Sequence, residues 1–394
     1  MESHAEVQER ALERPLTHHV RHTIQLSSFA FECGAVLEDV TIAYETWGRL
    51  NAARDNVVVV CHALTGDAHA GPGSPDGWWA DLIGPGCAID TNRFFVIASN
   101  VLGGCAGSTG PSSLAPDGTP YALRFPLVTV RDIVNAQIRL LDELGVGQVQ
   151  MVIGGSLGGM QVWEWPLLAP GRVRCAVPIA AHAAFTPMGI GYNEAMRQAI
   201  VCDPNWHQGN YYGRGDGPRA GLAAARSIGM LTYRTNDLYR ARFGREPAER
   251  ANSRTDDALS VFTEPQFAVE SYLHYQGKKL NDRFDANSYL YLTRAMDTHD
   301  IGRGRGGLAA ALRAFGETRL CVIAIDSDYL YAASDLRETA ELAVRCGVDC
   351  TYREMSSIYG HDAFLLEQRQ LGALLAELEG GVSIEPHRFP RAAD

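Results

Sequence analysis

One hexapeptide constrains the fold of this chain more than any other stretch: Gly-Gly-Ser-Leu-Gly-Gly at residues 154–159. An apolar, strand-like run at residues 149–153 precedes it, and a helix-like run that starts at Met160 follows. Glycines around a serine between a strand and a helix predict a very tight turn, because only residues without a side chain fit there. Such a turn lifts the Ser156 hydroxyl above a sheet edge, at a helix N-terminus that favours developing negative charge. The pattern indicates covalent acyl chemistry on Ser156.

Strand-like and helix-like segments alternate through most of the chain. Several strand-like runs are continuously apolar, as is typical of parallel strands buried on both faces. These runs are residues 40–44, 57–61, 94–98, 149–153, 176–179, 320–324 and 350–352. The clearest amphipathic helix between them covers residues 128–144. The alternation predicts a mostly parallel, doubly wound α/β sheet and, with the serine turn, the α/β-hydrolase fold.

The alternation lapses over residues 183–307, where helix-like segments and aromatic residues gather. The helix-like segments there are residues 193–201, 220–231, 265–275 and 288–296. We interpret this region as a helical lid inserted over the strand ends, because ligands of open α/β sheets bind at that edge. A second helical domain packed elsewhere is the alternative. Residues 21–182 and 308–394 then form the α/β-hydrolase core, and the charged, aperiodic residues 1–20 are expected to be a loosely ordered arm.

Composition and charge argue against several classes of protein. The net charge of −11 is unfavourable for binding nucleic acid, which needs a basic face. No apolar run approaches the length of a membrane span. The first residues are polar and acidic, unlike a signal peptide, and nine cysteines without C-x-x-C spacing fit reduced thiols. We therefore expect a cytoplasmic protein with no nucleic-acid or membrane partner, and the sequence offers no cluster of metal ligands.

A serine nucleophile needs a base, and the base needs an orienting carboxylate. In the chain order typical of α/β-hydrolases, the carboxylate follows a late strand and the histidine follows the last one. His361 fits because it lies between the final strand-like run and an apolar helix. Asp326 and Asp328 both follow the preceding strand-like run, so both are candidates for the carboxylate, although either could cap the next helix instead.

Three other histidines lie near the expected site. His62 and His69 stand in and after the loop that follows the run at residues 57–61, and we favour structural roles for both. His182 follows the strand after the serine turn and could approach the site, so its role stays open.

The tetrahedral intermediate of acyl transfer needs two backbone N–H donors for its oxyanion. The N–H of Leu157, directly after the serine, is one candidate. The other should come from residues 62–66, in the loop after an early strand, and Leu64 is the candidate there. Only the backbone of Leu64 would matter to this role.

Several long strings go beyond a general hydrolase pattern. Two of them are Gly-Ser-Thr-Gly-Pro-Ser-Ser at residues 107–113 and Arg-Phe-Asp-Ala-Asn-Ser-Tyr-Leu-Tyr at residues 283–291. Further strings lie at residues 62–69, 77–79, 83–86, 99–105, 154–161, 203–206 and 359–365. Together they resemble the homoserine O-acetyltransferase family of methionine biosynthesis, and the match covers about residues 42–367.

The resemblance implies an α/β-hydrolase fold with a helical lid, usually a homodimer, that needs no bound cofactor and uses acetyl-CoA as co-substrate. It implies a ping-pong reaction, in which acetyl-CoA acylates the serine and the homoserine hydroxyl then takes the acetyl group. The triad it implies is Ser156, Asp328 and His361, with Asp326 as second choice. It also implies that Arg226 holds the substrate carboxylate and Asp362 its ammonium group, which suits their charges.

Alternatives within and outside the family stay open. Related enzymes use succinyl-CoA, although residues 62–69 and 99–102 look acetyl-type, and serine is an acceptor only one methylene shorter, a difference of about 1–3 kcal/mol. A plain carboxylesterase would share the triad, whereas the intact triad argues against a non-catalytic binding module. One departure from the family is Ala332-Ala333 after Tyr331, where the family commonly has aromatic-Pro-Pro.

Overall fold

The computed structural model of the chain describes residues 20–73, 75–249 and 258–380. Within these residues one sheet has eight strands in the order β1-β2-β6-β3-β7-β8-β9-β10. The strands are β1 (Val20–Ala30), β2 (Val36–Trp47), β3 (Val57–Cys61), β6 (Phe95–Ser99), β7 (Val149–Gly155), β8 (Val173–Ile179), β9 (Arg319–Ile325) and β10 (Cys350–Met355). A separate short pair is formed by β4 (Ile83–Gly84) and β5 (Ile89–Asp90). The predicted α/β-hydrolase sheet is confirmed.

The sheet is parallel from β6 through β10, whereas β2 pairs antiparallel with both β1 and β6. The sequence did not predict β1, because its apolar and polar residues alternate instead of forming an apolar run. That alternation suits an edge strand with one face toward solvent. The arm expected over residues 1–20 lies outside the described residues, except that Val20 begins β1.

Both faces of the sheet are buried under separate apolar layers. Along β3, Val57 and Val59 join a cluster with α2 (Val130–Glu143), α3 (Leu157–Leu168) and α11 (Ala333–Arg345), whereas Val58 and Val60 face the opposite way. The opposite cluster includes residues of α12 (Ala363–Leu366) and α13 (Gln368–Gly380). This burial on both faces explains why the parallel strands read as continuous apolar runs.

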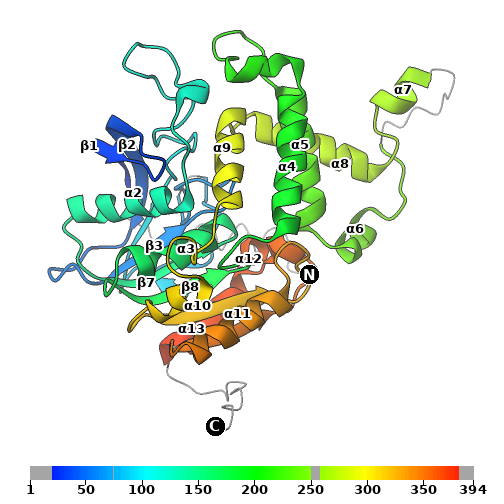
Figure 1. Cartoon of the computed structure of the whole chain (residues 1–394). Helices are drawn as coiled ribbons and strands as arrows, with labels where there is room; N and C mark the ends of the chain where they lie inside the picture. The colour runs from blue at the N-terminus through cyan, green and yellow to red at the C-terminus, as the bar shows by residue number, and fades with distance from the viewer. Residues whose placement is uncertain (1–19, 74, 250–257, 381–394) are drawn as a thin grey trace.

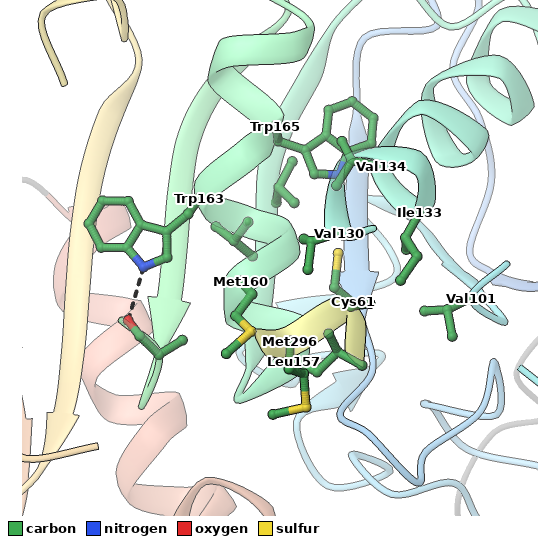
Figure 2. Packing of buried hydrophobic residues seen from close by; sticks show 14 of the residues in the cluster. Cys61, Val101, Val130, Ile133, Val134, Leu157, Met160, Trp163, Trp165 and Met296 are labelled. Atoms are coloured by element: carbon green, nitrogen blue, oxygen red, sulfur yellow. Dashed lines mark hydrogen bonds between the residues drawn. The ribbon is translucent and has the colours of Figure 1, made fainter. Parts of the chain in front are cut away.

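The helix α3, which follows the serine turn, is buried along nearly its whole length. Trp163 and Trp165 are fully buried in it, and each indole N–H has a partner, as a buried indole requires. Trp163 donates to the Ala181 carbonyl at 2.9 Å (Figure 2), and Trp165 donates to Gln137 Oε1 at 2.9 Å. These contacts hold the helix, and therefore the turn at its N-terminus, firmly against the sheet.

A helical insertion separates β8 from β9 and stands away from the sheet, toward the top of Figure 1. Its helices are α4 (Pro187–Val201), η2 (Pro204–Gly209), α5 (Arg219–Tyr233), α6 (Asn236–Phe243), α7 (Ala258–Thr263), α8 (Ala268–Asn281) and α9 (Ala286–Asp297). The chain then returns through α10 (Leu308–Arg313) to β9. The segment predicted as a lid, residues 183–307, contains all the insertion helices.

The insertion leaves and re-enters the core at one narrow place, which we call the stalk (residues 183–185 and 299–301). Ala184 and Asp300 form an antiparallel bridge there. The core helix α2 is bonded to the segment that returns to the core, because Arg131 donates to the Asp300 carbonyl at 3.1 Å and to the Arg303 carbonyl at 2.6 Å. The stalk is therefore fixed by hydrogen bonds to the core.

The loop after β3 is anchored on β2 by a histidine. His69 Nδ1 lies 2.7 Å from Glu45 Oε2, and its Nε2 lies 2.6 Å from the Pro75 carbonyl oxygen. Because both ring nitrogens face acceptors, this environment favours the imidazolium, in which both nitrogens donate. Burial alone would lower the pKa of His69, but the hydrogen bonds to Glu45 and Pro75 outweigh it, so the pKa is raised.

This pair makes stability depend on pH with a defined sign. A folded-state pKa above the unfolded one stabilises the protein fully below the unfolded pKa, and the contribution disappears as pH rises through the folded pKa. We expect His69→Gln to lower the free energy of unfolding by about 1–3 kcal/mol at pH 5.5, and by progressively less toward pH 8.5, in urea titrations. His274→Gln, in an exposed part of α8, is the control. A difference that stays constant over this pH range would contradict the assignment.

Candidate active site

Ser156 occupies a backbone conformation that residues with a side chain rarely adopt. Its φ is 58° and its ψ is −126°, and it stands at the N-cap of α3. Such a conformation costs about 1–3 kcal/mol and persists only where its surroundings enforce it. The enforcing contacts are a hydrogen bond from the Ser156 N–H to the Ile179 carbonyl and one from the Met160 N–H to the Ser156 carbonyl, both 3.0 Å.

The glycines around Ser156 are required by close packing. A Cβ on Gly158 would lie 2.1 Å from the Cys61 carbonyl oxygen, and one on Gly155 would lie 2.5 Å from the Phe364 ring. A Cβ on Gly159 would lie 2.4 Å from that of Ala181. The first turn of α3 therefore approaches the end of β3 as closely as backbone allows.

His361 and Asp328 form a buried pair. His361 Nδ1 lies 2.7 Å from Asp328 Oδ2, and Asp328 Oδ1 accepts from the N–H groups of Leu330 at 2.8 Å and Tyr331 at 3.0 Å. A carboxylate on Nδ1 fixes the tautomer in which Nε2 can accept a proton. The Nε2 atom is buried and has no hydrogen-bond partner in the described part of the chain.

Of the two candidate carboxylates, the structure brings only Asp328 to His361. Asp326 accepts instead from the Ser357 N–H at 3.1 Å, in the loop after β10. The loop that carries His361 is held next to the serine turn, since Phe364 lies over Gly155 and packs edge-on against His361, with ring centroids 5.6 Å apart.

The two candidate oxyanion donors are both buried. Leu157 begins α3, and Leu64 lies in the loop after β3. Neither backbone N–H donates a hydrogen bond to any of the described residues, so both are available to an oxyanion. His62 shapes that loop: its Nδ1 lies 2.8 Å from the Ala63 carbonyl, and its Nε2 accepts from the Val101 N–H at 3.0 Å.

The two candidate substrate-binding residues share one neighbourhood. Burial raises the pKa of Asp362, and the charges of Arg234 and Arg226 oppose that shift. Arg226 lies half-buried on α5, with its guanidinium carbon 5.9 Å from the Tyr233 ring centre. No hydrogen bond or ion pair of Arg226 occurs within the described residues. A partly desolvated guanidinium of this kind can take a carboxylate ligand.

Arg234 is a site residue that the sequence did not reveal. Its Nε lies 3.1 Å from Asp362 Oδ2, and both side chains are largely buried. The residues are far apart in sequence, and Arg234 stands at the C-cap of α5, where an arginine usually indicates only a favourable end charge. No local pattern could have paired it with Asp362.

His182 does not join the His361 pair. Its ring packs against Tyr331, with centroids 5.0 Å apart, and its Nε2 lies 3.6 Å from Asp335 Oδ2. Burial lowers the pKa of His182, which favours the neutral ring.

Two further findings concern ligands and membranes. Among the described residues, no group of three or more His, Cys, Asp or Glu side chains could hold a metal ion. None of the helices in the same residues is long and apolar enough to cross a membrane.

Comparison with known proteins settles the family. A family model described as the alpha/beta hydrolase fold matches residues 56–344. A homoserine O-acetyltransferase of Symbiobacterium thermophilum is 53% identical over 358 residues, which cover 88% of this chain and 92% of that protein. The chain belongs to the homoserine O-acetyltransferase family. This identity confirms the family resemblance predicted from the sequence motifs. The protein is an acyltransferase.

Solved structures show how widely this architecture is shared. The crystal structure of homoserine O-acetyltransferase from Bacillus anthracis superposes with a TM-score of 0.83 at 26% identity, over 91% of this chain and 97% of that one. Esterase E22 gives the same TM-score of 0.83 at 27% identity, over 91% and 99%. Similarity of fold alone therefore does not separate acetyltransferases from esterases. The 53% identity to the Symbiobacterium thermophilum protein is what places this chain with the acetyltransferases.

The close approach at Gly158 can be tested by adding one methyl group. We expect Gly158→Ala to lower the free energy of unfolding by at least about 3 kcal/mol, because the new Cβ meets backbone that cannot move away. Gly147→Ala is the matched control, since a Cβ there meets nothing within 4 Å. Urea unfolding of both variants checks this, and a Gly158→Ala protein within about 1 kcal/mol of the parent would refute the packing argument.

Proposed function

We propose that this protein transfers an acetyl group from acetyl-CoA to the hydroxyl of L-homoserine through an acyl-enzyme on Ser156. The product is O-acetyl-L-homoserine, for methionine biosynthesis. The observation that carries the proposal is the 53% identity, over 88% of the chain, to a protein named homoserine O-acetyltransferase. The buried His361–Asp328 pair beside a strained serine supports the same chemistry.

In the first half-reaction, His361 Nε2 takes the Ser156 proton as Oγ attacks the thioester carbonyl. The backbone N–H groups of Leu64 and Leu157 hold the oxyanion of the tetrahedral intermediate. The C–S bond then breaks, and the protonated His361 returns its proton to the sulfur, so that CoA leaves as a thiol. Asp328 stabilises the imidazolium that forms in between.

The second half-reaction runs the same groups in the opposite direction. The homoserine hydroxyl gives its proton to His361 Nε2 and attacks the ester carbonyl. The bond between the acyl carbon and Ser156 Oγ breaks, and the proton returns to Oγ. Transfer then prevails over hydrolysis because the helical insertion acts as a lid that limits water at the ester.

The acceptor is recognised by its two charges. Arg226 holds the α-carboxylate of homoserine, and Asp362 holds its ammonium group. Arg234 binds Oδ2 of Asp362 at 3.1 Å and so holds the carboxylate in place, which leaves Oδ1 for the ammonium group. The homodimer stays a prediction from the family resemblance, and the cytoplasmic location stays a prediction from the composition of the chain.

A carboxylesterase is the second candidate, because esterase E22 has the same fold with a TM-score of 0.83. An esterase would release the acetyl group to water at a rate that homoserine does not increase. The two functions therefore differ in how the acyl-enzyme is discharged.

We expect acetyl-CoA alone to add one acetyl group to Ser156 in rapid-quench mass spectrometry, and succinyl-CoA to acylate far more slowly. L-Homoserine should discharge the adduct faster than L-serine by about 10-fold or more, given one methylene of difference, and faster than water. Ser156→Ala should form no adduct and lose activity by at least about 10³-fold. Ser334→Ala, an exposed serine on α11, is the control. Discharge that homoserine does not accelerate would indicate the esterase.

The carboxylate-binding role of Arg226 predicts a selective change. Arg226→Met should raise the KM for homoserine by roughly 10–100-fold, because a charge-assisted contact is lost. Acylation by acetyl-CoA should stay within about threefold, since the acyl donor does not use this contact. Arg219→Met is the control, because Arg219 lies exposed on the same helix and pairs with Asp282 at 3.1 Å. An equal loss in both half-reactions would argue against carboxylate recognition.

A further inference from the structure

Tyr331 is fixed at the reaction centre although the mechanism above does not use it. Its ring is fully buried and stacks on the imidazole of His361, with centroids 4.9 Å apart and planes 19° apart. His182 and Phe185 pack against the same ring, with centroid distances of 5.0 and 5.8 Å. A ring held by these neighbours has little freedom, so the direction of its hydroxyl is set by packing.

The Tyr331 hydroxyl lies in the neighbourhood of the nucleophile. Burial raises its pKa well above the ordinary value, and the Ser156 side chain is the neighbour that opposes this shift. The phenol therefore keeps its proton at neutral pH.

Neither the Tyr331 hydroxyl nor His361 Nε2 has a hydrogen-bond partner that meets normal geometry in the described part of the chain. Leaving a buried polar group without a hydrogen-bond partner is unfavourable, so such a group needs an explanation. A bound ligand or a catalytic role is one explanation. Both groups belong to one stacked pair of rings, and the Tyr331 hydroxyl has Ser156 as a neighbour. In the proposed reaction, the leaving sulfur of CoA and the attacking oxygen of the acceptor occupy in turn the position beside Ser156 and His361.

We propose that the Tyr331 hydroxyl is a catalytic hydrogen-bond donor to the oxygen of the acceptor in the second half-reaction. The inference rests on the proposed acetyl transfer and adds a residue to it. The acceptor proton goes to His361 Nε2, the new C–O bond forms, and the bond to Ser156 Oγ breaks. Tyr331 keeps its own proton and orients the acceptor oxygen by donating to its second lone pair.

In this role Tyr331 assists the steps in which the reacting atom beside it is the acceptor oxygen, but not the step in which it is the thioester sulfur. A thioether or thioester sulfur is a weak hydrogen-bond acceptor, whereas an alcohol oxygen is a good one. Loss of the phenol hydroxyl should therefore slow steps with oxygen at this position and leave the thioester step nearly unchanged. The reverse reaction, in which O-acetyl-L-homoserine acylates Ser156, passes through the same transition state and should slow equally.

The test compares half-reactions on Tyr331→Phe, which retains the ring. Acylation by acetyl-CoA, followed by CoA release in rapid quench, should stay within about threefold of the parent. Discharge by homoserine and acylation by O-acetyl-L-homoserine should each fall by about tenfold, as expected for one lost hydrogen bond. Because the comparison is a ratio of rates on one protein, it does not depend on the fraction of active enzyme.

Tyr272→Phe is the matched control, because Tyr272 also carries a buried hydroxyl without a partner among the described residues, within the insertion helix α8. Tyr272→Phe should change neither the rate of discharge by homoserine nor the rate of acylation by O-acetyl-L-homoserine, each relative to acylation by acetyl-CoA. Equal losses in the thioester and oxygen steps of Tyr331→Phe, or no loss in either, would overturn the proposal. If the parent enzyme forms no adduct with acetyl-CoA, the proposed function itself fails, so the two failures are distinguishable.

Discussion

The active site depends on one close approach, between the first turn of α3 and the end of β3. The Cys61 carbonyl occupies the space that a side chain on Gly158 would need, at 2.1 Å from its Cβ position. Since the helix must begin there, Ser156 is forced into a backbone conformation with φ 58°. That strain is offset by the burial of α3 with its two fully buried tryptophans, some distance from the chemistry (Figure 2). The nucleophile is thus positioned by the packing of the core together with its own backbone hydrogen bonds to Ile179 and Met160.

Much of this arrangement could be predicted from the sequence, because parallel strands end at a common edge. The serine, the aspartate and the histidine each follow a strand-like run, so their proximity follows from the order β7, β9, β10. The choice between Asp326 and Asp328 needed the family pattern, and the structure brings Asp328 to the histidine at 2.7 Å. The catalytic roles themselves stay predictions that rest on this geometry and on the family.

Sequence reasoning missed the strand β1 and the placement of two side chains, those of Arg234 and Tyr331. β1 has one face toward solvent, and so its sequence lacks a continuous apolar run. Arg234 reaches Asp362 only because the end of α5 packs on the loop of His361, a contact between distant segments. In the sequence Tyr331 stood out only beside a departure from the family pattern, and its stacking on His361 appears only in the structure. Side-chain direction across distant segments is not encoded in local periodicity.

The stalk has a consequence for how such enzymes diversify. The chain enters and leaves the insertion at the bridge of Ala184 with Asp300, so the insertion helices can lengthen, shorten or change without altering the strand order. Arg226 and Arg234 belong to this insertion, whereas Ser156, Asp328, His361 and Asp362 belong to the core. Changes in the insertion can therefore alter the proposed contact of Arg226 with the acceptor without altering the acyl chemistry. One sheet scaffold can then underlie both acetyltransferases and esterases, as the equal TM-scores of 0.83 for both kinds of relative illustrate.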